Sequence, residues 1–415
     1  MQHGLVEGEA SVGLAPTPGV LARDIGAAMA RTSVRSLGDA GSCSDRLAED
    51  RAWDGLGAAA AEPNVFAERW FVQAAAAHLP QGADARAILA WSGGTGAPRL
   101  IGSFPFVMAP RYGRMPLRHV ASWTHHHCFL GSSMVRAGHE ASAWRAILGA
   151  LDDAAWARGL VHVTGLVEGG PTHRGLAQAA AQLGRPCDIV HRTERALLQS
   201  DLSPQAYYEA TVRAKKRKEL RRLRSRLAEL GPVAVHRLAP GDEVETWCDR
   251  FLSLEASGWK GRSGSALASE VGTGRFFRDV VAGAHAAGRL EMIRLDVDAR
   301  PIAMLVNLFA APGSFSFKIA YDEAFARYSP GVLVARENYA VLDRSDIAWT
   351  DSCAVEDHPM INSLWAERRP VVRVSVPIAG WRRRGVFRVA RTAEKLAARL
   401  RSRSRPIPSA ERPPR

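Results

Sequence analysis

The sequence has few cysteines, and they are arranged in no recognisable motif. The 415 residues contain five cysteines, widely separated and without a C-x-x-C pair. An odd and scattered set argues against a disulfide framework and against a cysteine-based zinc site, and it favours a reducing cytoplasm. The five are Cys43, Cys128, Cys187, Cys248 and Cys353.

Long apolar runs and secretion signals are absent as well. The longest apolar run, from Pro301 to Pro312, contains Asn307 and predicts a buried strand rather than a membrane span. The N-terminus has no basic segment followed by an apolar one, so we expect no secretion. With 47% hydrophobic and 23% charged residues the chain is typical of globular proteins, and its length predicts two domains.

The positive charge of the chain is confined to two segments. The formal net charge is +13. Residues 382–415 contain twelve Lys/Arg and two Glu, a net of +10, and residues 213–226 contain nine Lys/Arg and one Glu, a net of +8. The rest of the chain therefore carries −5 and is mildly acidic. Each basic segment needs its own explanation.

The pattern of apolar residues predicts two similar α/β units in one chain. Residues 1–50 are predicted to be disordered, 51–200 and 201–381 to form the two domains, and 382–415 to be a basic tail whose tip is disordered. In the first unit we expect a helix from about Pro63, helices at 140–158 and 174–183, and strands at 87–91, 100–108 and 161–167. In the second we expect helices at 204–230, 242–257, 274–287 and 331–343, and strands at 233–238, 290–296, 302–310, 314–320 and 347–353.

Four segments carry a family resemblance. Residues 251–262 read FLSLEASGWKGR, 315–323 read FSFKIAYDE, 325–332 read FARYSPGV, and 116–120 read PLRHV. In this order and spacing the chain resembles the cellulose-biosynthesis (CelD/BcsL-type) acetyltransferases of the GNAT superfamily over roughly residues 60–375. The resemblance implies a mixed α/β fold of tandem GNAT-like (acyl-CoA N-acyltransferase) domains arranged as in Fem-type transferases, with acyl-CoA (acetyl-CoA) as donor. The family name does not establish cellulose as the pathway.

The segment from Tyr328 to Val332 is the candidate donor site. Ser329 suits a helix N-cap, Pro330 the first helical position, and Gly331 a close approach of a ligand to the backbone. Helix N-termini bind phosphate groups. The segment keeps only one glycine of the family's pyrophosphate loop, and an ordinary helix start is the alternative.

The catalytic candidates in the second half are Lys318, Tyr321, Asp322 and Glu255. Tyr321 is a candidate to protonate the departing thiolate, and Lys318 to bind a phosphate or an acceptor carboxylate. Strict alternation along a strand places these two on opposite faces unless a bulge intervenes. A surface pair of Lys318 with Asp322 is the alternative.

Glu255 ends an apolar helix just before Trp259 and Lys260. A carboxylate desolvated beside Trp259 would have a raised pKa and accept a proton from the acceptor, whereas the alternative is an ion pair of Glu255 with Lys260. We assign Trp259, Lys260 and Asp351 to the acceptor site, Asp351 being also a second candidate base.

Three further features have competing interpretations. The helix within 204–230 has an apolar stripe of leucines and a cationic face suited to CoA phosphates, RNA or membrane phosphate, or simply to solvent; its four leucines are Leu220, Leu223, Leu227 and Leu230. Three consecutive histidines, 125–127, alternate in direction, so we expect no metal, and either a place in the cleft of the first domain or a structural role. A helix from about Val386 to Leu400 favours peripheral contact with anionic lipid, with a disordered tail as the alternative.

We predict direct transfer of an acyl group to an amine or hydroxyl of an envelope or polysaccharide-related acceptor, a small molecule or a glycan. No covalent intermediate is needed, because catalysis rests on positioning with acid–base help. We expect a cytoplasmic protein without nucleic-acid partners, with attachment to the inner face of the membrane as an alternative to a free cytoplasmic protein. One rival function is a Fem-type aminoacyl-tRNA-dependent transferase, although the long coiled-coil hairpin of many Fem proteins is missing. The other is a non-catalytic, membrane-associated component of a polysaccharide synthesis complex.

Overall fold

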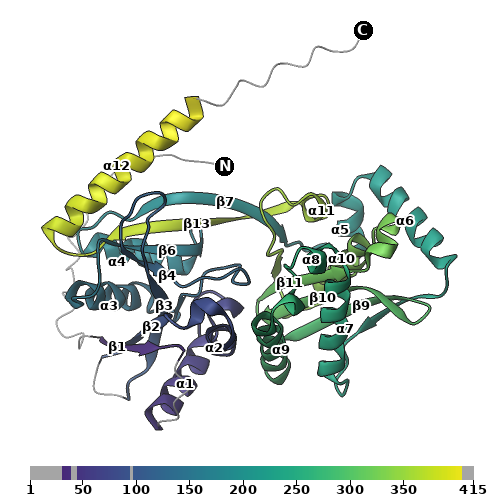
Figure 1. Cartoon of the computed structure of the whole chain (residues 1–415), viewed down its shortest axis with the longest axis horizontal. Coiled ribbons are helices and arrows are strands. Elements are labelled where there is room, and N and C mark those ends of the chain that lie inside the picture. Colours follow the sequence, from purple (N-terminus) through teal and green to yellow (C-terminus); the bar gives the residue numbers. More distant parts are fainter. Residues whose placement is uncertain (1–29, 39–43, 94–96, 404–415) are drawn as a thin grey trace, which may run out of the picture.

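The computed structural model describes residues 30–38, 44–93 and 97–403. In this part of the chain one mixed sheet of thirteen strands runs through the whole molecule, in the order β1-β2-β3-β4-β6-β13-β7-β12-β11-β10-β9-β8, with β5 paired to β3. Figure 1 shows two halves side by side, with the long strands β7 and β13 running from one to the other. The strands are β1 (Arg31–Ser36), β2 (Arg86–Trp91), β3 (Leu100–Ala109), β4 (His119–Ser122), β5 (Met134–Val135), β6 (Leu160–Val167), β7 (Asp188–Leu198), β8 (Val233–Arg237), β9 (Leu290–Val297), β10 (Arg300–Ala310), β11 (Gly313–Tyr321), β12 (Trp349–Asp351) and β13 (Glu367–Pro377).

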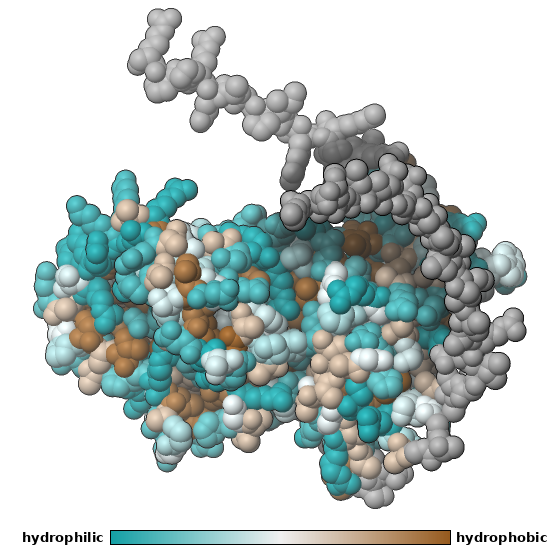
Figure 2. Space-filling view, turned by 180° about the vertical axis from the view of Figure 1, so that it is seen from behind, coloured by the Kyte–Doolittle hydropathy of each residue, from teal (hydrophilic) through white to brown (hydrophobic). Residues whose placement is uncertain are grey.

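Helices cover both faces of this sheet. Hydrophilic side chains gather at the upper left of Figure 2, over the region of α6. No helix among the described residues is both long and apolar enough to cross a membrane. The α-helices are α1 (Ser44–Gly57), α2 (Arg69–His78), α3 (Glu140–Asp153), α4 (Pro171–Gln182), α5 (Pro204–Thr211), α6 (Ala214–Ala228), α7 (Val244–Ser257), α8 (Trp259–Arg262), α9 (Val271–Ala286), α10 (Pro330–Glu337), α11 (Pro359–Asn362) and α12 (Trp381–Arg403); the 3-10 helices are η1 (Val65–Ala67), η2 (Pro80–Gly82), η3 (Leu267–Ser269), η4 (Glu323–Tyr328) and η5 (Asn338–Asp343).

The two halves repeat one order of elements. In the first, a strand and two helices (β1, α1, α2) precede the antiparallel run β2-β3-β4, and α3 leads to β6, which is parallel to β4. In the second, β8, α7 and α9 precede the antiparallel run β9-β10-β11, and α10 leads to β12, which is parallel to β11. The mixed α/β fold with two related units, expected from the sequence, is confirmed.

The last strand crosses the expected domain boundary. β13 belongs to the predicted second domain, 201–381, yet it pairs antiparallel with β6 on one side and β7 on the other, within the sheet of the first half. β7 in turn pairs with β12 of the second half. The two halves therefore share one continuous hydrogen-bonded sheet.

Several expected helices are shorter than the sequence pattern indicates. The helix expected at 204–230 is two helices, α5 and α6, because the backbone is extended at Val212 and Arg213. The helix expected at 331–343 ends at Glu337 and continues as the 3-10 helix η5. The hairpin of β9 and β10 is as expected, with positive φ at Asp298 and Ala299 in the turn.

Part of the segment expected to be disordered is folded. Residues 1–29 and 39–43, with the tip of the basic tail, lie outside the described residues, but β1 pairs along its length with β2, and α1 begins at Ser44. The expectation of disorder for residues 1–50 is therefore wrong for 31–36 and 44–50. The fully buried Trp53 of α1 donates a hydrogen bond from Nε1 to the carbonyl of Ala67 at 3.0 Å.

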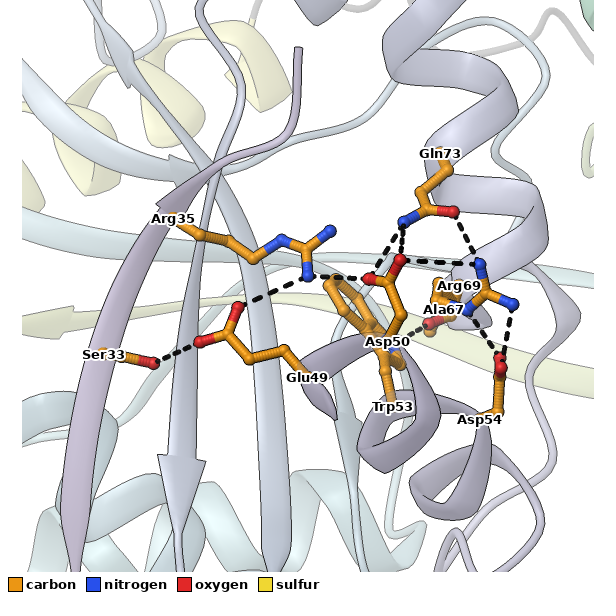
Figure 3. A network of polar contacts seen from close by, with 9 residues as sticks. All are labelled: Ser33, Arg35, Glu49, Asp50, Trp53, Asp54, Ala67, Arg69 and Gln73. Carbon is orange, nitrogen blue, oxygen red and sulfur yellow. Dashed lines mark hydrogen bonds and ion pairs between the residues drawn. The ribbon is translucent and has the colours of Figure 1, made fainter. Parts of the chain in front are cut away.

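A network of charged side chains holds β1 and α1 to α2 (Figure 3). Arg35 of β1 pairs with Asp50 of α1 at 2.9 Å and lies over the Trp53 ring. Arg69 of α2 makes a bidentate pair with Asp54 of α1, with both N–O distances 2.8 Å. The sequence did not predict β1 and α1 because they have few apolar residues and because the partners of their charged side chains lie in other elements.

The two halves also contact each other through helices and aromatic side chains. Helix α2 packs on α9, and Phe71 meets Phe276 edge to face with ring centroids 5.5 Å apart. His78 lies 2.6 Å from Asp279, and Arg289 forms an ion pair with the buried Glu68. One hydrophobic core cluster therefore contains residues of both halves.

Replacing Trp53 tests whether α1 is an integral part of the fold. We expect Trp53→Ala to lower the free energy of unfolding by about 3–5 kcal/mol, because it leaves a large cavity and removes the bond to Ala67. Leu47→Ala on the exposed face of the same helix is the control and should change it little. Chemical denaturation measures both; equal, small effects would show that α1 is only loosely attached.

Candidate active site at the junction of the two halves

The parallel strands β11 and β12 separate soon after they meet. They pair over only three residues, up to Phe315 and Asp351, while β11 continues to Tyr321. Beyond Phe315, this edge of β11 has no strand neighbour among the described residues. Helix α10 begins at Pro330, after the end of β11. In open α/β sheets, ligands bind outside the carboxyl ends of parallel strands, often at a helix N-terminus.

Lys318 of β11 is the most unusual titratable group of this region. Its Nζ donates to Nδ1 of His127 at 2.9 Å and lies 5.2 Å from the ring centroid of Phe129. Burial, with a smaller contribution from Lys260, lowers the pKa of Lys318 to about 8, although the charge of Glu255 opposes this. Lys318 is therefore mostly an ammonium ion at neutral pH, in surroundings that make the loss of its proton easy.

The loop after β4 brings two histidines of the first half to Lys318. The His127 ring stacks on Phe276 at 5.3 Å, and the His125 ring stacks on Phe71 at 5.9 Å. Burial and the nearby Lys318 lower the pKa of each histidine to about 3, so both are neutral at physiological pH. Because Lys318 donates to Nδ1 of His127, the ring proton of His127 sits on Nε2.

Glu255 completes this group from the side of α7. It is only 5% exposed, and its carboxylate accepts from Nζ of Lys260 at 2.7 Å and from the backbone N–H of Leu267 at 2.8 Å. The ion pair with Lys260, given above as the alternative for Glu255, is thus present. Trp259 is largely exposed and does not supply the burial. We call Lys318, His125, His127, Glu255 and Lys260 the junction cluster.

The histidine loop places two of its three rings together. His125 and His127 face the same side, with ring centroids 6.1 Å apart, whereas His126 is exposed. Nowhere in the described ranges do three or more His, Cys, Asp or Glu side chains gather as metal ligands would.

The two cysteines nearest the cluster are poor nucleophiles. Burial raises the pKa of Cys128 to about 12 and that of Cys353 well above its usual range. Because a cysteine attacks as the thiolate, these thiols are unsuited to forming a covalent acyl intermediate at neutral pH.

Tyr321 and Lys318 lie on opposite faces of the sheet, as strict alternation predicts. Lys318 faces α7, α9 and the histidine loop, whereas Tyr321 packs with α10 in the other core cluster of the second half. A Cβ on Gly331 would meet the Tyr321 ring at 3.2 Å. The bulge in β11, opposite Val306 and Asn307, comes before Lys318 and so does not bring the two together.

Asp322 and Asp351 are both engaged in structural contacts. Asp322 caps η4 by accepting from the Ala324 N–H at 2.9 Å, and it pairs with Arg300. Asp351 is fully buried and accepts from Arg369 at 3.2 Å and from the Cys353 N–H at 2.8 Å. Neither carboxylate belongs to the junction cluster.

A large basic cavity, which we call the donor cavity, lies where α6 and α10 meet, in the part of the second half whose core cluster also includes Tyr321. Its volume is about 940 Å³, and it lies between α6, η4 and the start of α10. Ser329 and Val332 line it, whereas Tyr328 is buried. Ser329 adopts a left-handed conformation (φ 53°) and its side chain does not cap α10, contrary to the N-cap role expected from the sequence. The basic side chains of the lining are Arg213, Lys215, Lys216, Arg222 and Arg327.

The sequence indicates a cationic face on α6 that suits phosphate groups, but it gives no sign that this face belongs to the donor site. Leu220, Leu223 and Leu227 are buried as the stripe predicts, but Leu230 is exposed. This packing places the cationic side of α6 next to Ser329, more than a hundred residues further along the chain. The histidine loop was likewise not connected to Lys318, because 191 residues separate His127 from Lys318.

Comparison with known proteins supports the fold and one domain. A family model described as "Acetyltransferase (GNAT) domain" matches residues 214–342. Among solved structures, FemX matches with a TM-score of 0.50 at 10% identity, covering 79% of this chain and 95% of its own. At that identity the likeness shows the fold alone, and the tandem GNAT-like arrangement expected from the sequence is confirmed.

Two further structures match less closely. The C-terminal domain (DUF2156) of a putative lysylphosphatidylglycerol synthetase from Agrobacterium fabrum has a TM-score of 0.48 at 11% identity, covering 79% of this chain and 91% of its own. A tandem GNAT protein from the clavulanic acid biosynthesis pathway has a TM-score of 0.43 at 15% identity, covering 85% and 99%. No curated protein matches the sequence. The narrower CelD/BcsL-type assignment stays a prediction.

Replacing Asp351 tests whether this residue has a structural or a catalytic role. We expect Asp351→Asn to lower the free energy of unfolding by about 3–5 kcal/mol, because Arg195 would then be buried without its counter-charge and Arg369 would keep only Glu62, at 3.8 Å. The control Asp346→Asn, in an exposed pair with Arg344, should have little effect. Denaturant titration measures both; a stable but inactive Asp351→Asn protein would instead support the role as a base or acceptor ligand.

Proposed function

We propose that this chain, which carries a GNAT acetyltransferase domain over residues 214–342, transfers an acyl group from acyl-CoA directly to an amine or hydroxyl. One observation carries the proposal. The start of α10, which follows β11 in the chain, lines the donor cavity, whereas Lys318 of β11 belongs to the junction cluster and lies beside the edge of β11 that β12 leaves unpaired. Donor and acceptor can then approach the same strand.

The donor cavity suits the phosphate-rich head of CoA. Five cationic side chains line it, and its only lining carboxylate, Glu219, is held by Arg222 at 2.6 Å. Lys216 is partly buried and bonded to Ser363, so it is positioned rather than mobile. A volume of about 940 Å³ is within the range of ligand sites, and the N-terminus of α10 adds a favourable dipole for phosphate.

The free edge of β11 suits the extended arm of the donor. The arm of CoA contains amide groups, which can hydrogen-bond to the unpaired backbone of residues 316–321 as an added strand would. The thioester at the end of the arm would then lie along β11, near Lys318. An interior strand left unpaired on one edge is otherwise costly, because its backbone groups need partners.

Lys318 is the proposed catalytic residue. As an ammonium ion it has two N–H groups left after its bond to His127, and it can stabilise the negative charge that develops on the thioester oxygen. His127 orients Lys318, and the charge of Glu255 favours the ammonium form. Glu255 remains the proposed acceptor of the proton that the attacking amine or hydroxyl loses, and CoA leaves as the thiolate, which takes up a proton from solvent. Direct transfer fits the high pKa values of Cys128 and Cys353.

The acceptor and the location rest on the sequence resemblance. We infer an envelope or polysaccharide-related acceptor, either a small molecule or a glycan. Because acyl-CoA is made and used in the cytoplasm, the enzyme would work there. The same basic surface would also attract the phosphates of tRNA, so a Fem-type aminoacyl donor is the alternative that the binding experiment must separate.

Calorimetric titration with acetyl-CoA, free CoA and mixed tRNA tests the donor. We expect saturable CoA binding that weakens about ten- to a hundredfold in Lys216→Ala and in Arg327→Ala, because each loses a charged hydrogen bond to phosphate. Arg221→Ala, on the exposed side of α6 outside the cavity, is the matched control and should bind normally. Salt-sensitive tRNA binding without CoA binding would favour the Fem-type function. Binding of neither CoA nor tRNA would favour the non-catalytic component.

The pH dependence of transfer tests Lys318. With an acceptor found by screening amines and hydroxyl compounds for CoA release, kcat/KM should fall as the pH rises through about 8, because the ammonium form is lost above its pKa. Neither histidine should add a transition between pH 5 and 8, since both stay neutral there.

Two substitutions complete this test. Lys318→Met should retain CoA binding while lowering kcat by about a hundredfold or more. Lys318→Arg keeps the positive charge at all accessible pH values and should lose the alkaline fall. A rate that rises through pH 8 in the wild type would show instead that neutral Lys318 acts as a base.

A further inference from the structure

The last helix is fixed to the first half by a small set of contacts. α12 follows β13, and Figure 1 shows it along the outer side of the first half, away from the second half. Phe387 and Ala390 are buried with Tyr112 and Leu160. Glu394 accepts a hydrogen bond from the Tyr112 hydroxyl at 3.0 Å, and Arg391 pairs with Asp188 at 2.9 Å. The described part of α12 is therefore a docked element with a defined orientation.

Beside its buried face, α12 has apolar side chains that nothing described in the structure covers. Trp381 is 79% exposed, Val389 70% and Leu396 58%, and Val386 is also exposed. We call these four residues the α12 apolar strip. Together with side chains of the segment before β4, three of them line a groove of about 550 Å³ whose accessible surface is almost entirely apolar. Such an exposed patch marks an interaction surface.

Cations surround the α12 apolar strip. Arg382, Arg384, Arg388 and Lys395 are exposed, and none of the four forms an ion pair with a described carboxylate. Two further cations of the helix, between residues 381 and 396, have partners: Arg391 pairs with Asp188, and Arg383 donates to backbone carbonyls. The surface therefore combines an apolar strip with unneutralised positive charge.

This combination fits an anionic bilayer better than a second copy of the chain. In a symmetric dimer the same arginines would face each other and repel. At a membrane the apolar side chains enter the acyl boundary, Trp381 lies at the level of the headgroups, and the long cationic side chains reach lipid phosphates.

We propose that α12 is a membrane-docking helix that holds the protein on an anionic lipid surface, lying parallel to it. This docking is separate from the donor cavity and does not depend on the proposed acyl transfer. It places the first half against the lipid, with the second half, which carries the donor cavity, farther along the sheet. An acceptor at a membrane surface would then be within reach of the enzyme.

Sedimentation with vesicles tests the apolar part of the proposal. The full-length protein should bind vesicles of phosphatidylcholine mixed with phosphatidylglycerol and bind vesicles of phosphatidylcholine alone much more weakly. Val389→Asp should weaken binding at least about tenfold, because it places a carboxylate in the strip. Val355→Asp, at a valine 72% exposed outside α12, is the matched control and should bind normally. Thermal unfolding followed by circular dichroism confirms that both variants are folded.

A charge-reversal pair tests the electrostatic part. Arg384→Glu combined with Arg388→Glu should abolish most binding to anionic vesicles, and binding of the wild type should fall with salt. Arg221→Glu combined with Arg226→Glu makes the same change of charge on α6 and should leave vesicle binding nearly unchanged. Equal loss in both pairs would show that only net charge matters and would overturn the proposal.

Two other outcomes would also overturn it. Normal vesicle binding by a folded Val389→Asp protein would show that the strip does not enter the lipid. Light scattering that shows a dimer of the wild type and a monomer of Val389→Asp would assign the strip to contact between copies of the chain.

Discussion

The placement of β13 between β6 and β7 is the constraint on which the rest of the structure depends. Without this strand, β7 would have no partner connecting it to the first half, and the pairing of β7 with β12 would not join the two sheets. The continuous sheet, together with the packing of α2 on α9, fixes the histidine loop against β11. Lys318 can be partly buried because that loop supplies a neutral acceptor for its proton, since an ammonium ion buried without a partner is costly. The junction cluster is thus a consequence of topology.

Local patterns in the sequence predicted the elements whose hydrogen bonds are local. The β9–β10 hairpin and most helices lie where periodicity and turn residues placed them, because both signals act over a few residues. β7 and β13 were missed since their partners are distant in sequence and their exposed faces carry Arg, His and Glu, which mask the strand pattern. The N-terminal strand and helix were missed for a related reason: their stability comes from charged pairs with α2 and from one buried tryptophan, not from a local apolar run.

The site was predictable in composition but not in arrangement. Lys318, Glu255 and Lys260 were named from the resemblance and the local chemistry, and the structure brings these three together. Their partner His127 had no local signal that pointed to Lys318. Tyr321, Asp322 and Asp351 lie outside the cluster for reasons that alternation and burial explain. Gly331 illustrates a further limit: its small size was attributed to ligand approach, whereas the direction of its missing side chain is toward Tyr321. Only the fold tells which neighbour a glycine accommodates.

The two basic segments show how packing decides what positive charge does. In α6 the apolar stripe packs against the core. The cations therefore face the start of α10 and line the donor cavity. In α12 the described apolar side chains are divided between a buried face and an exposed strip, so the cations beside the strip face outward. The remaining chain carries a net charge of −5. An anionic surface therefore attracts both basic segments and repels the acidic remainder. Because α12 also has an exposed apolar strip, the orientation in which this helix meets the lipid is favoured, while anionic donors are drawn to α6.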